Sequence, residues 1–196
     1  MAEKKKDEAE KEQFELRTVN VPEQFRPLFE QADRQVAAYF RKRTEDPTRA
    51  TIEISGERYI LVRAAAMSIG FHEMIRQMLD TADEEEAAYQ ASSILYDLAK
   101  TIGRADARKF HESLGLTDPV QKLSTGPVHF AYCGWAYVDI HPSSHPSPDD
   151  DYYLRYDHPY SFEADSWLRA GKRSSQPVCV MNAGYSAGWC EESFGL

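Results

Sequence analysis

The sequence lacks the paired cysteines, long apolar runs and signal-peptide features that mark several protein classes. Its 196 residues include three cysteines, Cys133, Cys179 and Cys190, which stand far apart and form no CxxC motif. A disulfide framework is therefore not expected, and a reducing cytoplasm is the expected location. No run of 18 apolar residues occurs, so no membrane-spanning segment is expected. The charged stretch Met1–Glu12 is not expected to be a signal peptide.

Basic residues are also fewer than acidic residues. The 23 Lys and Arg face 32 Asp and Glu, which gives a formal net charge of −9. Such a field repels phosphate, so direct binding of nucleic acid is not expected. The sequence contains no P-loop and no GxGxxG fingerprint, and we assign no nucleophile elbow. These absences favour a protein that is not an enzyme.

The first half of the chain has helical character. We expect a charged, flexible arm over residues 1–21, a connecting or dimerisation segment over 22–49 whose helix ends near Arg43, and the main domain over 50–196. Alternating residues around Ser55-Gly56 predict a β-hairpin over 50–63. Helices are expected over 64–80 and from an Asp83 cap to about 102, where Gly103 should end the helix, followed by a short helix over 105–114.

The second half is richer in aromatic residues. The segment 126–140, GPVHFAYCGWAYVDI, has the β-branched and aromatic content of a strand. We expect a polar loop over 141–159 that holds one short strand (152–156), then a short helix over 161–168, a strand over 177–182 and a helix over 183–194. Helices first, then strands mixed with helices, indicate an α+β fold with helices packed on an antiparallel sheet.

Four features could carry function, and each also has a structural explanation. The loop that holds His141, His145, Asp149 and His158 could bind a metal, but its Pro, Ser and Asp content is typical of a solvated loop. The three cysteines are best explained as small buried hydrophobic residues. The Gly184–Gly188 run predicts close packing, within the domain or at a subunit interface. The aromatic residues after 128 could line a small-molecule pocket or fill a core.

Several short segments resemble one known family. Pro177-Val178-Cys179 followed by Asn182-Ala183-Gly184-Tyr185-Ser186-Ala187-Gly188-Trp189 is similar to the PVC…GYxxG(Y/W) segment of the 4-vinyl reductase-type sensor domains of aromatic-catabolism activators. Ser161-Phe162-Glu163-Ala164, the stretch LYDLAKTIGRADA over 95–107 and the hairpin GERYIL over 56–61 are similar to further segments of that family. The resemblance covers roughly residues 50–196.

The resemblance implies a fold and a role. The family shares an α+β arrangement with vesicle-tethering subunits and is usually homodimeric. Its sensor domains bind a small aromatic or apolar effector and control an output domain, often a transcription-activating ATPase. In the phenol sensors of this family a zinc ion is held by the Cys of the PVC motif, here Cys179, and by later residues that would lie beyond Leu196. No cofactor is therefore certain, and zinc is expected only if those ligands exist.

The sequence thus predicts a cytoplasmic small-molecule sensing domain. The effector pocket would draw on residues of the aromatic segment and of the family motifs, with Lys122 or His129 as a polar contact: Lys122, His129, Phe130, Tyr132, Trp135, Trp167 and Tyr185. Expected partners are the effector, a second copy of the chain and an output domain. The alternatives are a dimeric scaffold without ligand and, with less support, a role in tetrapyrrole vinyl reduction.

Overall fold

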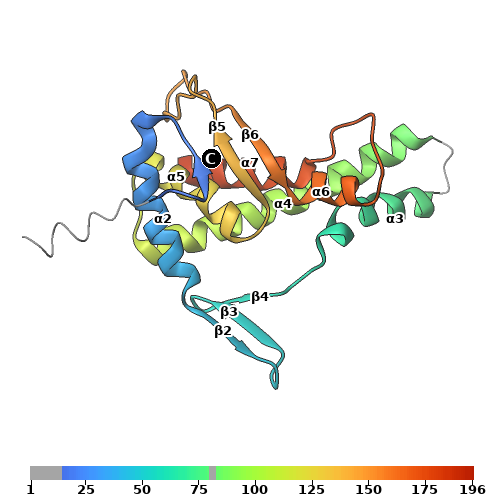
Figure 1. The fold of residues 1–196 in the computed structure, drawn as a ribbon, viewed down its shortest axis with the longest axis horizontal. Coiled ribbons are helices and arrows are strands. Elements are labelled where there is room, and N and C mark those ends of the chain that lie inside the picture. Colours follow the sequence, from blue (N-terminus) through green and yellow to red (C-terminus); the bar gives the residue numbers. More distant parts are fainter. Residues whose placement is uncertain (1–14, 80–82) are drawn as a thin grey trace, which may run out of the picture.

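A computed structural model describes residues 15–79 and 83–196, so residues 1–14 of the arm predicted over 1–21 lie outside the described residues. The described residues form six α-helices and two three-stranded sheets (Figure 1). The elements are, in chain order, β1 (Val19–Asn20), η1 (Glu23–Phe25), α2 (Arg26–Phe40), β2 (Arg43–Asp46), β3 (Thr51–Ile54), β4 (Glu57–Tyr59), η2 (Ala64–Met67), α3 (Ile69–Leu79), α4 (Glu84–Leu114), α5 (Pro119–Tyr132), β5 (Ala136–Ile140), β6 (Tyr156–Ser161), α6 (Phe162–Arg169) and α7 (Val180–Phe194).

The larger sheet has the strand order β1-β5-β6 and packs against helices, which confirms the α+β prediction. Strands β5 and β6 are antiparallel, with Ala136 opposite Ser161 and Ile140 opposite Tyr156. Strand β1 is parallel to β5, with Val19 opposite Val138. The end of the predicted arm is therefore part of the sheet, because Val19 is an apolar residue that the core buries almost completely.

The smaller sheet, β2-β3-β4, is antiparallel and projects from the body of the protein (Figure 1). The predicted hairpin is confirmed as β3 and β4. Ser55 and Gly56 both have positive φ, 52° and 87°, as a two-residue turn that matches strand twist requires. Helix α2 ends at Phe40, earlier than predicted, because the chain enters β2 at Arg43 and pairs with β3.

Helix α4 is one continuous helix of 31 residues, so the prediction that Gly103 ends it was wrong. Asp83 caps it as expected, and its carboxylate accepts from the backbone N–H groups of Glu85 and Glu86 at 3.0 and 3.1 Å. Gly103 is buried because α7 crosses it so closely that a Cβ there would overlap the carbonyl group of Tyr185. Close helix packing therefore outweighs the low helix propensity of glycine.

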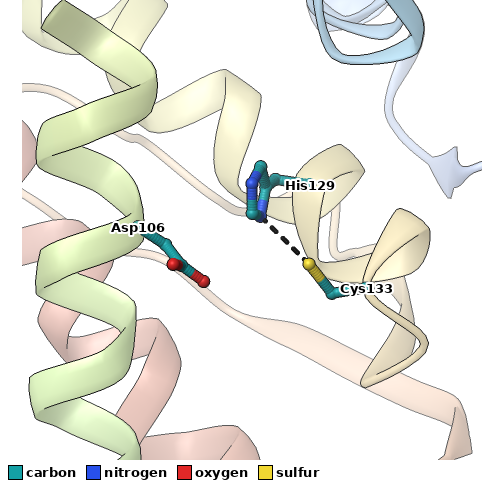
Figure 2. A group of neighbouring side chains, drawn as sticks. All are labelled: Asp106, His129 and Cys133. Atoms are coloured by element: carbon teal, nitrogen blue, oxygen red, sulfur yellow. Dashed lines mark hydrogen bonds between the residues drawn. The ribbon is translucent and has the colours of Figure 1, made fainter. Parts of the chain in front are cut away.

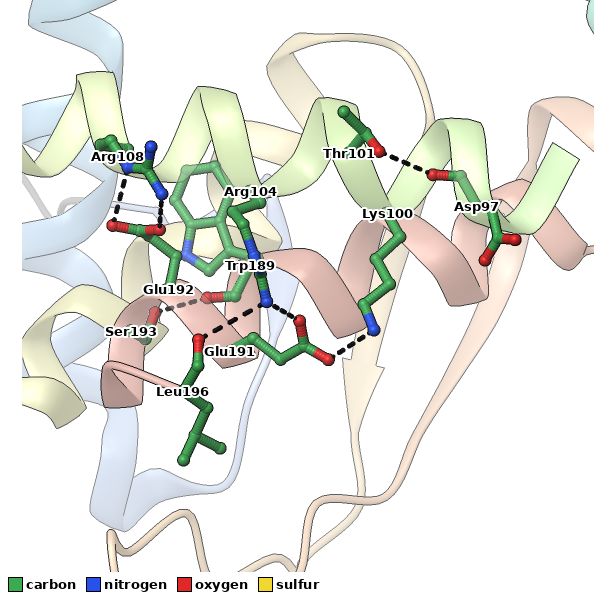
Figure 3. Close-up of polar contacts among 10 residues, drawn as sticks. All are labelled: Asp97, Lys100, Thr101, Arg104, Arg108, Trp189, Glu191, Glu192, Ser193 and Leu196. Carbon is green, nitrogen blue, oxygen red and sulfur yellow. Dashed lines mark hydrogen bonds and ion pairs between the residues drawn. The ribbon is translucent and has the colours of Figure 1, made fainter. Parts of the chain in front are cut away.

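Helices α4 and α7 lie side by side, and two further glycines of α7 make the contact. A Cβ at Gly184 would overlap the carbonyl of Tyr96, and one at Gly188 the carbonyl of Lys100. The predicted tight packing of the Gly184–Gly188 run is confirmed, and the run is covered by the protein's own α4. Along one edge of this pair, Lys100 and Arg104 form ion pairs with Glu191, and Arg108 pairs with Glu192 (Figure 3).

The segment expected to be a strand over 126–140 is helix up to residue 132 and strand only from residue 136. Helix α5 spans Pro119–Tyr132, and only Ala136–Ile140 forms a strand. The Asp118 carboxylate accepts from Gln121 N–H at 2.8 Å, and Pro119 occupies the first helical turn. These start signals and the burial of one helix face outweigh the strand propensity of the aromatic residues.

The strand predicted over 177–182 is also wrong, because α7 already begins at Val180. The predicted helix over 161–168 is confirmed as α6. Its buried Glu163 accepts from the backbone N–H groups of Met181 at 3.0 Å and Asn182 at 2.9 Å. A carboxylate from α6 therefore satisfies the free amides in the first turn of α7, and this contact is not visible in local sequence.

Across residues 15–79 and 83–196, no helix combines the length and apolar character needed to cross a membrane.

Candidate functional site

An apolar cavity of about 50 Å³ lies between the larger sheet and the helices that cover it. Helices α2 and α5, strand β5, the 146–156 segment and α7 all contribute to its wall. The predicted pocket residues Phe130 and Tyr185 both line it. The wall is almost entirely apolar and includes Phe29, Leu123, Val138, Ile140, Leu154 and Trp189.

Two predicted residues lie just behind this wall. Trp135 does not line the cavity, but its ring lies 5.7 Å from Phe130 and 4.7 Å from Tyr185, centroid to centroid. His129 is fully buried, and its ring lies 4.9 Å from that of Trp189. Both residues therefore support side chains that line the cavity.

Three predicted residues lie elsewhere. Tyr132 is exposed, and its ring stacks on that of Phe40 with 5.1 Å between the ring centroids. Lys122 contributes its backbone carbonyl, which accepts from Trp189 Nε1 at 3.1 Å. Trp167 is separate from the cavity, because α6 carries it to a second hollow near α3.

The second hollow is larger, about 540 Å³, and its character is different. It is open and is bounded by α3, the start of α4, α6 and the segment 172–176. Charged residues such as Glu73, Arg76 and Lys172 line it, and Glu73 pairs with Lys172. Trp167 and His72 contact each other there at 5.6 Å between ring centroids. Such a surface suits a polar molecule better than an aromatic hydrocarbon or phenol.

His158 was assigned to a solvated loop, yet it lies beside the apolar cavity. It stands on β6, and its ring lies 5.5 Å from Phe130 and 5.1 Å from Tyr156, two residues of the cavity wall. Burial lowers the pKa of this imidazole, and its buried Nε2 has no hydrogen-bond partner among the described residues. The sequence offered no signal for this position, because β6 was expected four residues too early.

A polar cluster of four residues joins three helices next to the cavity, and Figure 2 shows three of its members, Asp106, His129 and Cys133. It consists of Asp106 on α4, His129 on α5, Cys133 at the end of α5 and Tyr185 on α7. The Tyr185 hydroxyl lies 2.9 Å from Asp106 Oδ2 and 3.0 Å from His129 Nδ1. Cys133 Sγ lies 3.5 Å from the same Nδ1. Asp106 and Cys133 were not recognised as site residues from the sequence.

Burial controls the protonation of this cluster. It raises the pKa of Asp106 to about 6, while the hydrogen bond from Tyr185 lowers it. It lowers the pKa of His129 to about 3, so this imidazole is neutral at pH 7. It raises the pKa of Cys133 far above its ordinary value, so the thiol is protonated. A protonated thiol is a poor nucleophile.

Among the described residues, the remaining motifs of the sequence analysis lie in three separate settings. Gly184–Gly188 spells Gly-x-Ser-x-Gly, but it lies inside α7, whereas a nucleophile elbow requires a turn between strand and helix. Burial raises the pKa of the Cys190 thiol. Cys179 precedes α7 and has Ser161 Oγ at 3.4 Å. Among the described residues, one group of three metal-ligating side chains has donor atoms within 4.8 Å of one another, and it contains neither Cys179 nor the 141–159 loop.

No family model matches the chain, and no curated protein matches it. A solved structure does: the crystal structure of the phenol-responsive sensory domain of the transcription activator PoxR with phenol. The likeness has a TM-score of 0.66 and 18% sequence identity, and it covers 89% of this chain and 80% of the other. The chain therefore shares the fold of a sensory domain from an activator.

Proposed function

We propose that this protein is a sensory domain, not an enzyme, that binds a small apolar or aromatic effector in the cavity between α2, α5, β5 and α7. The observation that carries the proposal is an apolar cavity in the interior of a fold shared with a phenol-responsive sensory domain. The motifs shared with the 4-vinyl reductase-type family support the same assignment. An output domain or protein would receive the signal, in the cytoplasm.

The cavity is smaller than an aromatic effector, and this determines how such an effector must bind. A cavity that holds benzene measures about 150 Å³, roughly three times the 50 Å³ found here. The effector must therefore displace part of the wall. Leu154 and Pro146 belong to the segment between β5 and β6, which has little regular structure and is the part of the wall most easily moved. The hydroxyl group of a phenol could form a hydrogen bond with His158 Nε2, which lies beside the cavity and has no other partner among the described residues.

Thermal unfolding with a panel of probes tests this proposal. We expect phenol, catechol or toluene to raise the midpoint, since a ligand at 100 times its Kd stabilises by about 2.7 kcal/mol. Val138→Phe should abolish the shift, because the larger ring fills the cavity. Tyr137→Phe is the matched control, because Tyr137 is on the same strand but its side chain lies on the opposite face.

Two results would overturn the proposal. One is the absence of any shift with every probe. The other is an equal shift in wild type and in a folded Val138→Phe variant. The first result would favour the alternative of a ligand-free scaffold, to which the small cavity volume also points.

We further propose that the protein is a homodimer. After β4 the chain runs towards η2 as a stretched segment without helix or strand (Figure 1), and in it Ile60 and Leu61 are 76% and 77% exposed. An extended, apolar segment beside an edge strand is suited to pairing with a second copy. Light scattering after size exclusion should give twice the chain mass for wild type and a monomer for the double variant Ile60→Lys, Leu61→Lys. A wild-type monomer at micromolar concentration would contradict the dimer.

A further inference from the structure

We propose that Asp106, His129 and Cys133 bind one divalent metal ion of the zinc class, at a site separate from the effector cavity and from Cys179. The three donor atoms, a carboxylate oxygen, an imidazole nitrogen and a thiol sulfur, lie within 4.8 Å of one another (Figure 2). This mixed O, N and S set is one that zinc accepts in proteins.

The geometry of the His129–Cys133 pair fits tetrahedral coordination. Bond lengths of about 2.05 Å for Zn–N and 2.3 Å for Zn–S place the two ligand atoms about 3.6 Å apart at a tetrahedral angle. The distance from Nδ1 to Sγ is 3.5 Å. The pair is four residues apart at the end of α5, so one helical turn presents both atoms on the same side. Asp106 reaches them from α4.

The charge around Asp106 supports a bound cation. Buried carboxylates in proteins are normally paired with a cationic group or a metal. Among the described residues, no Lys or Arg forms an ion pair with Asp106, and the nearby charge that affects it most is the carboxylate of Glu57. The surrounding groups, Tyr185 and Cys133, are neutral hydroxyl and thiol groups. A divalent ion would supply the missing positive charge.

Metal binding at this site releases one proton and leaves the complex without net charge. The ion displaces the thiol proton of Cys133, which leaves to solvent, and it coordinates the thiolate, the Asp106 carboxylate and His129 Nδ1. The imidazole proton then resides on Nε2, which has no hydrogen-bond partner among the described residues; the ring itself packs against that of Phe40. One 2+ ion and two anionic ligands give a neutral complex, which a buried site tolerates. The Tyr185 hydroxyl remains a donor to Asp106, as residues around metal ligands commonly are.

Two features give the site access and a link to the cavity. His129 is fully buried, but Asp106 and Cys133 are only partly buried, so part of the site is open to solvent. Tyr185 borders both places: its ring lines the apolar cavity and its hydroxyl contacts Asp106 and His129. An effector that moves Tyr185 would therefore also change the surroundings of the ion.

Cobalt substitution and native mass spectrometry test the site. After treatment of the full chain with a chelator and addition of Co²⁺ or Zn²⁺, we expect one equivalent of metal per chain. We also expect a thiolate-to-cobalt charge-transfer band with the visible bands of tetrahedral Co²⁺. Cys133→Ser should remove the charge-transfer band and weaken binding by more than about tenfold. Asp106→Asn, which keeps the side-chain shape, should weaken binding by a similar factor.

Cys179→Ser is the matched control, because Cys179 is also partly buried but belongs to no group of three metal-ligating side chains in the described chain. Three results would overturn the site. Wild type could show no charge-transfer band, Cys179→Ser could lose the band while Cys133→Ser keeps it, or Asp106→Asn could bind as tightly as wild type. The wild-type spectrum alone can overturn the site, so the proposal stays testable even if a variant fails to fold. Effector binding is measured separately, so either proposal can fail alone.

Discussion

The Tyr185 hydroxyl lies 2.9 Å from the Asp106 carboxylate and 3.0 Å from His129 Nδ1, and it connects three helices at the centre of the protein. A phenolic group has one proton to donate. In the metal-free protein, when it donates to the ionised Asp106, His129 Nδ1 must carry a proton and donate to the Tyr185 oxygen. One hydroxyl therefore determines the tautomer of a fully buried imidazole.

Removal of that hydroxyl should be costly. In Tyr185→Phe both Asp106 and His129 lose a buried partner, and we expect the free energy of unfolding to fall by about 1–3 kcal/mol. Urea denaturation in the presence of a chelator measures this without metal stabilisation. The control Tyr137→Phe should change stability by less than about 0.5 kcal/mol, since that hydroxyl lies near the surface. An equal loss in the two variants would show that the buried hydrogen bonds contribute nothing of their own.

Packing between α4 and α7 should be even less tolerant of change. Gly188→Val places a branched side chain against the backbone of Lys100, so the helices must separate. We expect a loss of about 3 kcal/mol or more, or failure to fold. Ala183→Val on the same helix is the control, because Ala183 is exposed. Circular dichroism and thermal unfolding measure both variants, and wild-type stability of Gly188→Val would refute the close contact.

The sequence predicted those parts of the fold that local signals determine. The Asp83 cap, the Ser55-Gly56 turn and the packing role of Gly188 were all visible in short segments. Gly103 was misassigned because its role depends on Tyr185, 82 residues later. The start of α7 was misplaced because its free amides are satisfied by Glu163 from another helix. Long-range contacts decide both positions.

The cluster of Asp106, His129 and Cys133 could not be found from the sequence for a related reason. In the predicted strand, residues four apart would lie about 13 Å from each other, whereas on a helix they lie about 6 Å apart. The strand assignment therefore separated His129 from Cys133. The Asp118-Pro119 pair was the available signal for a helix, since Asp is a frequent cap and Pro is favoured in the first turn. Asp106 becomes a neighbour only through the packing of α4 on α5.

The ion pairs on the edge of α4 and α7 should matter little in comparison with the glycine contacts. Glu191 pairs with Lys100 at 2.7 Å and also with Arg104, but all three side chains are partly exposed (Figure 3). Such pairs contribute about 0–1 kcal/mol, and salt screens them. We expect Glu191→Gln to cost less than about 1 kcal/mol in urea denaturation at low salt and less still at high salt. A loss above about 2 kcal/mol would identify the pairs as a main source of α4–α7 stability.

The buried carboxyl of Glu163 should make stability depend on pH. Burial raises its pKa to about 7, against an ordinary value of 4.5, although the amides of Asn182 and Met181 lower it. Between these two values the folded protein holds a proton that the unfolded chain has lost. The contribution of Glu163 to the free energy of unfolding therefore falls as pH rises from about 4.5 to about 7. The full change is of order 3 kcal/mol.

The variant Glu163→Gln isolates this effect, because the other groups that titrate in the same range, Asp106 among them, are common to both proteins and cancel in the difference. We expect the stability advantage of wild type over Glu163→Gln to be larger at pH 5 than at pH 7.5. Urea denaturation of both proteins across this range measures the difference at each pH. A difference that stays constant would show that Glu163 titrates alike in the folded and unfolded states. A difference that grows with pH would show that the amides of α7 outweigh burial and hold this carboxylate ionised.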